Sequence, residues 1–322
     1  MMIRLEKYYS DRVSLPFYLL LVYFYSAYFS LLRFEISLQY PPATLHKLTN
    51  FSADTPFQYR VLIPFIVHYI NSFISIDLII LYRLIEFLAV FLLILFYKKY
   101  LNNFIISEKY SFYFSLSICL ILPFNFLLPK ICNFYYPSDI SSILFTVIGL
   151  NYIYKNKLAY FYIVFLFATI NRETSLFLSF IFLIHYYNKI TFLKLSYHGI
   201  LQGIIWISIK SFLYHTFSDN PGRGLFESDH LSSNISFMIN PFNFLYFFSN
   251  MGFIWIFTFK FLDRIQNIFL TKSLWVILPH FLIMLFVGNI FELRIFGEMI
   301  PIVLTPLLTV IMDSMYNNNE TS

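Results

Sequence analysis

The chain has 322 residues, of which 59% are hydrophobic and 12% are charged, and its formal net charge is +5. Soluble domains carry about 25% charged residues, so this composition excludes an ordinary soluble enzyme. The cations are scattered along the chain rather than clustered. This pattern excludes a nucleic-acid-binding patch and is typical of the cations that flank membrane spans.

Hydrophobic runs predict an all-α polytopic membrane protein with about ten transmembrane helices. About 20 apolar residues cross a hydrocarbon core of roughly 30 Å, and ten such runs with their loops fill the whole chain, 1–322, as a single domain. The predicted spans are 14–32, 78–97, 110–128, 140–154, 158–170, 174–188, 196–215, 241–260, 273–288 and 299–313.

The first extracytoplasmic loop is predicted over 33–77, and a second over 216–240. Within the first, the segment 60–75 is apolar but short for a span. If it crossed the bilayer, Lys98 and Lys99 would lie outside and the positive-inside alternation would fail from there on. We therefore predict an amphipathic helix that lies flat at the interface, which places both termini in the cytoplasm.

Acidic residues gather on the predicted outer side, in short polar motifs. Glu35 follows the first span, and Asp54 lies further along the first loop. A carboxylate there could remove a proton from an acceptor hydroxyl, although either residue could equally be an exposed loop acid. Arg60 opens the interfacial helix, where the helix dipole disfavours a cation, so we predict that it binds an anion such as phosphate.

Two further motifs lie at the outer ends of later spans. Asp139 begins the span 140–154, where it could cap the helix or contact substrate. Asn171, Arg172 and Glu173 form a tight turn between two spans. Polar side chains there are costly unless they face protein or a wet cavity, so the turn is either an Arg172–Glu173 ion pair or a site for phosphate or sugar.

The last motif contains Glu292 and Arg294, next to the final span. Arginine grips phosphate bidentately, and Glu292 could orient it; a plain ion pair is the alternative. Two helices carry internal charges. Lys210 lies in the span 196–215 without a neighbouring acid and is a candidate for binding a lipid phosphate, with snorkelling as the alternative. Arg83 and Glu86 are three residues apart and are predicted to pair.

Metal-binding patterns are absent from the sequence. The seven histidines have no metal-ligand spacing, and two cysteines form neither a disulfide framework nor a zinc motif. We predict no cofactor, while a divalent cation beside the outer acids stays possible.

The pattern resembles the GT-C superfamily of polytopic glycosyltransferases. The resemblance lies in the acid just past the first span, Glu35, and in the stretch Pro-Phe-Gln-Tyr-Arg-Val-Leu-Ile-Pro, which ends at Pro64. That stretch is similar to the Tyr-Arg-Tyr-Thr-Pro stretch of the GPI mannosyltransferase branch. Family members often carry a DxD or Asp-Glu pair after the first span, whereas this chain has one Glu there and Asp54 downstream.

The resemblance implies inverting transfer of a sugar from a polyprenyl-phosphate donor to a glycan or lipid-linked acceptor on the extracytoplasmic face. Glu35 or Asp54 would be the base, and some of Arg60, Arg172, Lys210 and Arg294 would stabilise the departing phosphate. The abundance of Phe, Tyr, Ile and Asn, expected of an AT-rich gene, suggests surface-polysaccharide synthesis in a bacterial inner membrane.

Two other functions compete with this one. The first is a polysaccharide polymerase or ligase that uses diphosphate-linked glycans. The second is a non-enzymatic polysaccharide flippase or transporter, which predicts polar residues at mid-membrane depth and broken helices. The polar motifs instead lie at one membrane edge, which favours an enzyme.

Overall fold

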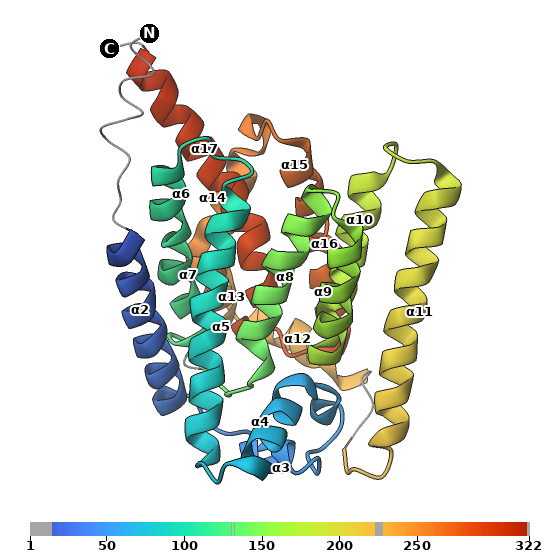
Figure 1. Cartoon of the computed structure of the whole chain (residues 1–322). Helices are drawn as coiled ribbons and strands as arrows, with labels where there is room; N and C mark the ends of the chain where they lie inside the picture. Colours follow the sequence, from blue (N-terminus) through green and yellow to red (C-terminus); the bar gives the residue numbers. More distant parts are fainter. Residues whose placement is uncertain (1–14, 130, 132, 223–227, 321–322) are drawn as a thin grey trace.

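In the computed structural model, which describes residues 15–129, 131, 133–222 and 228–320, the chain forms a bundle of α-helices (Figure 1). Strand-like pairing in these residues is limited to two isolated bridges. The predicted all-α class is therefore confirmed.

Four stretches of the described chain are long and apolar enough to cross a membrane. They are α2 (Leu15–Ile36), α5 (Leu78–Leu101), α15 with α16 (Ile268–Leu274 and Ile277–Val287), and η6 with α17 (Leu293–Met299 and Ile300–Glu320) over Leu293–Tyr316. A fifth is possible if α13 (Pro241–Phe248) and the helix pair after it, η4 (Asn250–Phe253) and α14 (Ile254–Lys260), form one bent span.

The prediction of ten full spans is not confirmed, although every predicted span contains helix. Several helices are too short: α8 (Ser138–Tyr154), α9 (Leu158–Asn171) and α10 (Leu176–Tyr186). The predicted span 110–128 is divided at Leu116 into α6 (Glu108–Ser115) and α7 (Ser117–Phe126). α11 (Phe192–Thr216) is long enough, but Lys194, Gln202 and other polar residues interrupt its apolar sequence.

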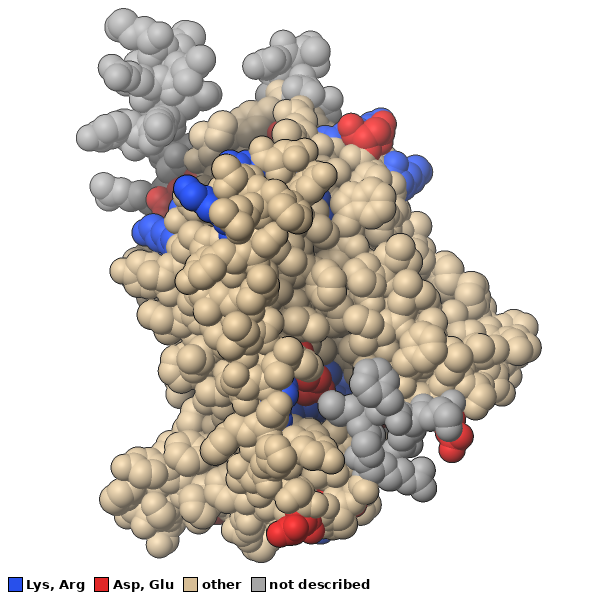
Figure 2. All heavy atoms as spheres, turned by 90° about the vertical axis from the view of Figure 1, so that its right-hand side faces the viewer, with Lys and Arg blue, Asp and Glu red and all other residues tan. Residues whose placement is uncertain are grey.

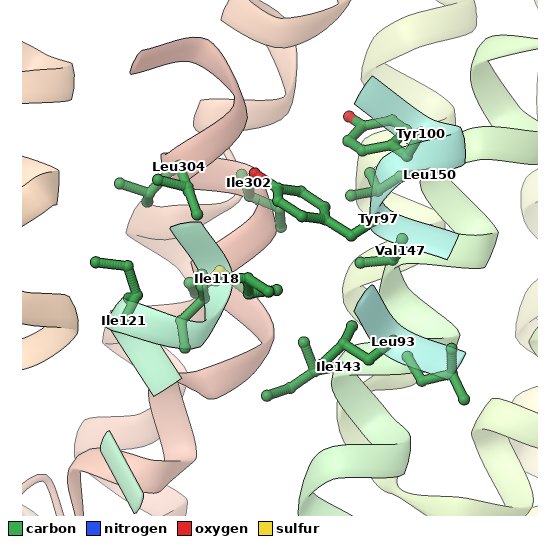
Figure 3. Close-up of a cluster of buried hydrophobic side chains, with 14 of the residues drawn as sticks. Leu93, Tyr97, Tyr100, Ile118, Ile121, Ile143, Val147, Leu150, Ile302 and Leu304 are labelled. Carbon is green, nitrogen blue, oxygen red and sulfur yellow. The ribbon is translucent and has the colours of Figure 1, made fainter. Parts of the chain in front are cut away.

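The centre of the bundle is a tightly packed apolar core between α5, α7, α8 and α17 (Figure 3). Tyr97 and Leu93 of α5 meet Val147 of α8 and Ile302 of α17, and all four are buried. Helices approach closely where a side chain is missing: a Cβ on Gly149 of α8 would lie 2.8 Å from the Leu178 side chain of α10. Since lipid is as apolar as this core, close packing rather than exclusion from water holds such helices together.

The bend between α13 and α14 is stabilised by Asn125 of α7. Met251, Gly252 and Phe253 all have positive φ, and the two pieces meet at 69°. The Asn125 side chain donates to the Asn250 side chain (2.7 Å) and to the Leu293 carbonyl (2.8 Å), and it accepts from the Met251 amide (3.0 Å). This one buried amide therefore hydrogen-bonds η4, where the helix is broken, and connects it to η6.

Replacing Asn125 with Ala is expected to destabilise the protein by about 1–3 kcal/mol, because buried donors and acceptors lose their partner. Denaturant unfolding in detergent micelles would measure the change. Asn103→Ala is the matched control, because that half-buried amide has two hydrogen bonds rather than three. Equal stability of the Asn125→Ala and control variants would contradict the role given to Asn125.

Because α2 continues to Ile36, the predicted first loop begins later, and the segment 37–77 folds as a small lobe across one end of the bundle (Figure 1), which we call the end lobe. It contains η1 (Pro41–Ala43), α3 (Leu45–Thr49), η2 (Phe57–Tyr59) and α4 (Leu62–Phe73). Ile63 and Val67 of α4 are buried, whereas Phe65 and Phe73 are exposed. An amphipathic helix thus lies where the sequence predicts one, and its position in a membrane stays a prediction.

The second predicted loop, 216–240, contains α12 (Ser228–Ile239). Asn234 anchors this helix to α16, because its side chain donates to the carbonyls of Leu285 (3.0 Å) and Gly288 (2.8 Å). Asn220, ahead of α12, donates to the carbonyls of Phe51 and Ala53 in the end lobe. The two predicted outer segments therefore meet in the fold.

Candidate functional site

A polar cleft of about 630 Å³ opens between the end lobe and the bundle. Most of the face seen in Figure 2 carries no charge, but acidic and basic side chains are visible in a hollow beside the end lobe. The cleft is lined by Tyr40, Pro42, Asp54, Thr55, Pro56, Phe57, Arg60, Arg172, Gly222, His230, Val287, Gly288, Asn289, Glu292, Arg294 and Ile295.

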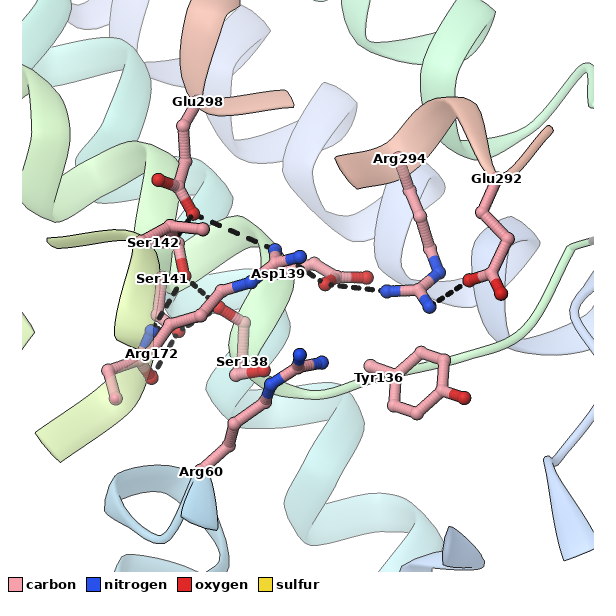
Figure 4. A network of polar contacts seen from close by, with 12 residues as sticks. Arg60, Tyr136, Ser138, Asp139, Ser141, Ser142, Arg172, Glu292, Arg294 and Glu298 are labelled. Carbon is pink, nitrogen blue, oxygen red and sulfur yellow. Dashed lines mark hydrogen bonds and ion pairs between the residues drawn. The ribbon is translucent and has the colours of Figure 1, made fainter. Parts of the chain in front are cut away.

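Asp139 lies behind the cleft and accepts hydrogen bonds from three arginines. Its carboxylate is 2.8 Å from Arg33 Nη2, 3.1 Å from Arg172 Nη1 and 3.2 Å from Arg294 Nη1 (Figure 4 shows the last two). The Asp139 side chain is fully buried and lines no part of the cleft. It therefore holds the three arginines in place from behind the cleft.

Helix ends explain part of this arrangement. Asp139 occupies the first turn of α8, where the dipole favours an anion, and Arg33 occupies the last turn of α2, where it favours a cation. The predicted capping role is not realised, because Pro137 is the N-cap and no side chain caps the helix.

Three further buried carboxylates each lie beside one of these arginines. Glu86 of α5 pairs with Arg33, and Glu292 pairs with Arg294. Glu298 lies 3.7 Å from Arg172 and accepts a hydrogen bond from Thr174 Oγ1 at 2.5 Å. Arg33, Arg172 and Arg294 are thus held by carboxylates of α5, of α8, and of η6 and its N-cap, which is the condition for burying charge without a large penalty.

The predicted pair of Arg83 and Glu86 is absent. Glu86 instead pairs with Arg33, and Arg83 pairs with Glu35 on the outside of the molecule. The Glu35 side chain is 67% exposed and does not line the cleft. The structure thus separates the two predicted base candidates, since Asp54 lines the cleft and Glu35 does not.

Asn171 fastens α9 to α8. Its amide donates to the Ser138 carbonyl (3.0 Å) and Ser142 Oγ (2.9 Å), and its oxygen accepts from Ser141 Oγ (2.9 Å). The side chain is fully buried and lines no part of the cleft. The tight polar turn is therefore possible because its groups are satisfied within the protein.

Glu173, at the start of η3 (Glu173–Ser175), pairs with Arg60 of the end lobe and not with Arg172. Arg60 Nη2 lies 2.6 Å from Glu173 Oε1, and Arg60 Nε lies 3.4 Å from Oε2. Burial opposes ionisation of Glu173, but the charges of Arg60 and Lys210 outweigh it and hold the pKa of the carboxyl well below its usual range. This pair connects the end lobe to the bundle.

Lys210 approaches this pair from α11. Its Nζ is buried and has no hydrogen-bond partner among the described residues, and Glu173 is the acid whose charge acts on it. Trp206, one turn earlier, donates to the Glu173 carbonyl at 3.0 Å. No acid is close to Lys210 along the sequence, because the acid that acts on it, Glu173, belongs to η3.

Two carboxylates face the cleft. Asp54 is partly exposed, and its Oδ1 lies 3.9 Å from Lys47 Nζ. Glu292 is buried, paired with Arg294, and accepts from Asn289 Nδ2 at 3.4 Å. Since Glu292 is committed to its arginine, Asp54 is the carboxylate better placed to take a proton from a bound molecule.

Several residues at the site were not candidates from the sequence. The Tyr136 ring lies under the Arg294 guanidinium, with 3.9 Å between the arginine carbon and the ring centroid. His230 reaches the cleft from α12, and its Nδ1 lies 3.1 Å from Asn289 Oδ1. Glu298 shares a sequence motif with Glu292 and Arg294, and His230 lies in the predicted outer loop 216–240.

No three His, Cys, Asp or Glu side chains in the described chain are grouped to hold a metal ion. The acids near the cleft are instead matched with guanidinium or ammonium groups. Among the described residues, the positive charges that line the cleft are guanidinium groups.

Comparison with known proteins identifies no relative. The sequence matches no family model, and no curated protein and no solved structure is significantly similar to it. Function therefore has to be inferred from the geometry of the cleft.

Proposed function

We propose that this protein is a membrane glycosyltransferase that moves a sugar from a polyprenyl-phosphate donor to a glycan or lipid-linked acceptor. The proposal places it in a bacterial inner membrane, with the cleft on the extracytoplasmic side and a role in surface-polysaccharide synthesis. The observation that carries it is the cleft itself, where three arginines and an accessible carboxylate, Asp54, line one cavity.

The charge of the cleft lining supports an anionic substrate. Three guanidinium groups, those of Arg60, Arg172 and Arg294, line the cleft together with two carboxylates, those of Asp54 and Glu292, while the other acids paired with these arginines lie outside the lining. The Nε atoms of Arg172 and Arg294 have no partner among the described residues. Guanidinium groups held in fixed positions suit a phosphate, because they do not have to reorganise as its charge develops.

The proposed reaction is an inverting transfer. Asp54 accepts the proton of the acceptor hydroxyl as its oxygen forms a bond to the anomeric carbon of the donor sugar. The bond from that carbon to the phosphate oxygen breaks, and polyprenyl phosphate leaves with the electron pair. Arg60, Arg172 and Arg294 stabilise the negative charge that develops on the leaving group.

The test is release of polyprenyl phosphate by the purified protein in lipid, with a panel of polyprenyl-phosphate sugars and a crude glycan acceptor. We expect Asp54→Asn to lower the rate by about 10²–10⁴-fold, as removal of a general base does. Glu35→Gln separates the two candidate bases: the geometry predicts a small effect, because Glu35 lies outside the cleft.

Asp219→Asn is the matched control, since Asp219 is an exposed acid that does not line the cleft. A large loss with Glu35→Gln and none with Asp54→Asn would contradict the assignment of the base. Turnover of diphosphate-linked oligosaccharides alone would indicate a polymerase or ligase instead.

One feature favours a transporter as the second candidate. The 69° bend between α13 and the helices after it is the kind of broken span found in transporters. Accessibility labelling of cysteines placed at Asn289 and Thr55, both in the cleft lining, discriminates between the two. Labelling from only one side of the membrane supports the enzyme, and labelling from each side in turn supports a transporter.

A further inference from the structure

A second cavity lies far from the polar cleft, at the end of the bundle opposite the end lobe, where α10, α11 and α15 meet (Figure 1). It is a groove of about 750 Å³ between α10 and α11. Its lining is almost entirely apolar and includes Leu183, Leu195, Ile200 and Trp275, with Lys272 as its one charged residue. Its volume falls in the range of about 300–1,000 Å³ that is typical of ligand sites.

Positive charge gathers at this end of the groove without an acid to balance it. Lys272 Nζ donates to the Tyr187 carbonyl at 3.5 Å, and Lys189 Nζ lies 3.1 Å from His185 Nε2. Neither lysine forms an ion pair with any described residue. The nearby stretches 174–218 and 264–291 contain no Asp or Glu at all.

Both lysines lie beside Tyr187, because Lys272 Nζ donates to its carbonyl and Lys189 follows it two residues later. Partial burial lowers the pKa of Lys189, and the charge of Lys272 lowers it further. Lysines that face each other without an anion are destabilised, and a bound anion would relieve that repulsion.

Aromatic residues at the same level indicate where the membrane surface lies. Tyr187 and Trp275 both line the groove and are more than half exposed. Exposed Tyr and Trp beside lysines are typical of the headgroup region, and the groove then extends from that level along α11 to Ile200. The arrangement offers a cationic headgroup site at one end and an apolar channel leading away from it.

We propose that this groove binds one anionic phospholipid, with its phosphate between Lys189 and Lys272 and an acyl chain along the groove between α10 and α11. The sequence places both lysines on the cytoplasmic side, so the lipid comes from the leaflet opposite the polar cleft. This site is independent of the proposed sugar transfer.

Trp275 provides a direct probe of occupancy. The protein would be reconstituted in phosphatidylcholine vesicles with increasing amounts of either dibrominated phosphatidylglycerol or dibrominated phosphatidylcholine, since bromine quenches tryptophan on contact. The part of the quenching that Trp275→Phe removes belongs to this site. Each lysine near an anionic headgroup strengthens lipid binding roughly fivefold. Half-quenching of Trp275 should therefore need a mole fraction of dibrominated phosphatidylglycerol on the order of 25-fold lower than that of dibrominated phosphatidylcholine.

Variants separate the site from general surface charge. Lys189→Gln with Lys272→Gln should abolish the preference for phosphatidylglycerol, whereas the control Lys155→Gln with Lys157→Gln, two exposed lysines of another loop on the same predicted side, should keep it. Ser196→Phe, which fills the groove, should weaken quenching by both lipids.

Equal half-quenching by the two lipids in the unaltered protein, or an equal loss of preference in the control variant, would overturn the proposal. If the double variant does not insert, Lys272→Gln alone should still lose about fivefold in preference. No sugar transfer enters the readout, so the outcome stands apart from that of the proposed function.

Discussion

Replacing Asp139 with Asn is expected to destabilise the protein by about 3–5 kcal/mol, the usual result of removing one partner from a buried ionic cluster. The substitution keeps the shape of the side chain but removes its charge. Arg33, Arg172 and Arg294 would keep Glu86, Glu298 and Glu292 as partners but would lose the one carboxylate that all three share. Denaturant unfolding in micelles, followed by helical circular dichroism, would measure the loss.

The control for Asp139 is Asp219→Asn, which removes the same charge from an exposed position. Adding Arg172→Gln to Asp139→Asn also removes one of the guanidinium groups that lost the shared carboxylate. The double variant should therefore be more stable than the sum of the two single effects predicts, by about 0.5–3 kcal/mol. Strict additivity would show that the two charges are not coupled.

Replacing Arg60 with Gln is expected to lower the rate of the proposed transfer by about 10²–10³-fold, as the loss of one group that stabilises developing charge does. Arg60 lines the cleft from the end lobe, whereas Arg172 and Arg294 line it from the bundle. Its loss would leave the leaving phosphate contacted from one side only. Arg60→Lys should recover part of the rate, because it keeps the charge but not the planar fork.

Arg60→Gln should also change how the stability of the folded protein depends on pH. Arg60 helps to hold the pKa of Glu173 below its usual range, so the ionised carboxylate stabilises the fold above its unfolded pKa of about 4.3. That contribution is lost as the pH falls. The stability difference between the native protein and Arg60→Gln should therefore be largest near neutral pH and shrink in acid.

Lys99→Gln is the control for this pH effect, because it removes one exposed cation and pairs with no acid among the described residues. It should lower stability little at any pH. A stability difference for Arg60→Gln that is the same in acid as at neutral pH would mean that Arg60 does not act through Glu173.

Much of the local structure could be predicted from the sequence. Helix occurs in every predicted span, and an amphipathic helix, Leu62–Phe73, lies within the segment predicted to be interfacial. Hydrophobic runs and helix-end residues act over a few positions, so the chain reveals them directly. Whether a helix is long and straight enough to cross a membrane depends also on residues far away in the sequence. Asn125, for example, stabilises a bend in a helix more than a hundred residues away.

The sequence also singled out polar side chains that meet in one place, because Arg60, Arg172, Glu292 and Arg294 all line the cleft. It could not determine their partners. Glu35 and Asp54 are equivalent as loop acids in the sequence, whereas in the fold Glu35 lies in α2 outside the cleft and the packing of the end lobe puts Asp54 in the cleft. Asp139 meets Arg33, Arg172 and Arg294 because α2, α8, α9 and η6 converge there. Hydrophobicity is a property of neighbours along the chain, whereas the pairing of charges depends on distances that exist only after the helices have packed.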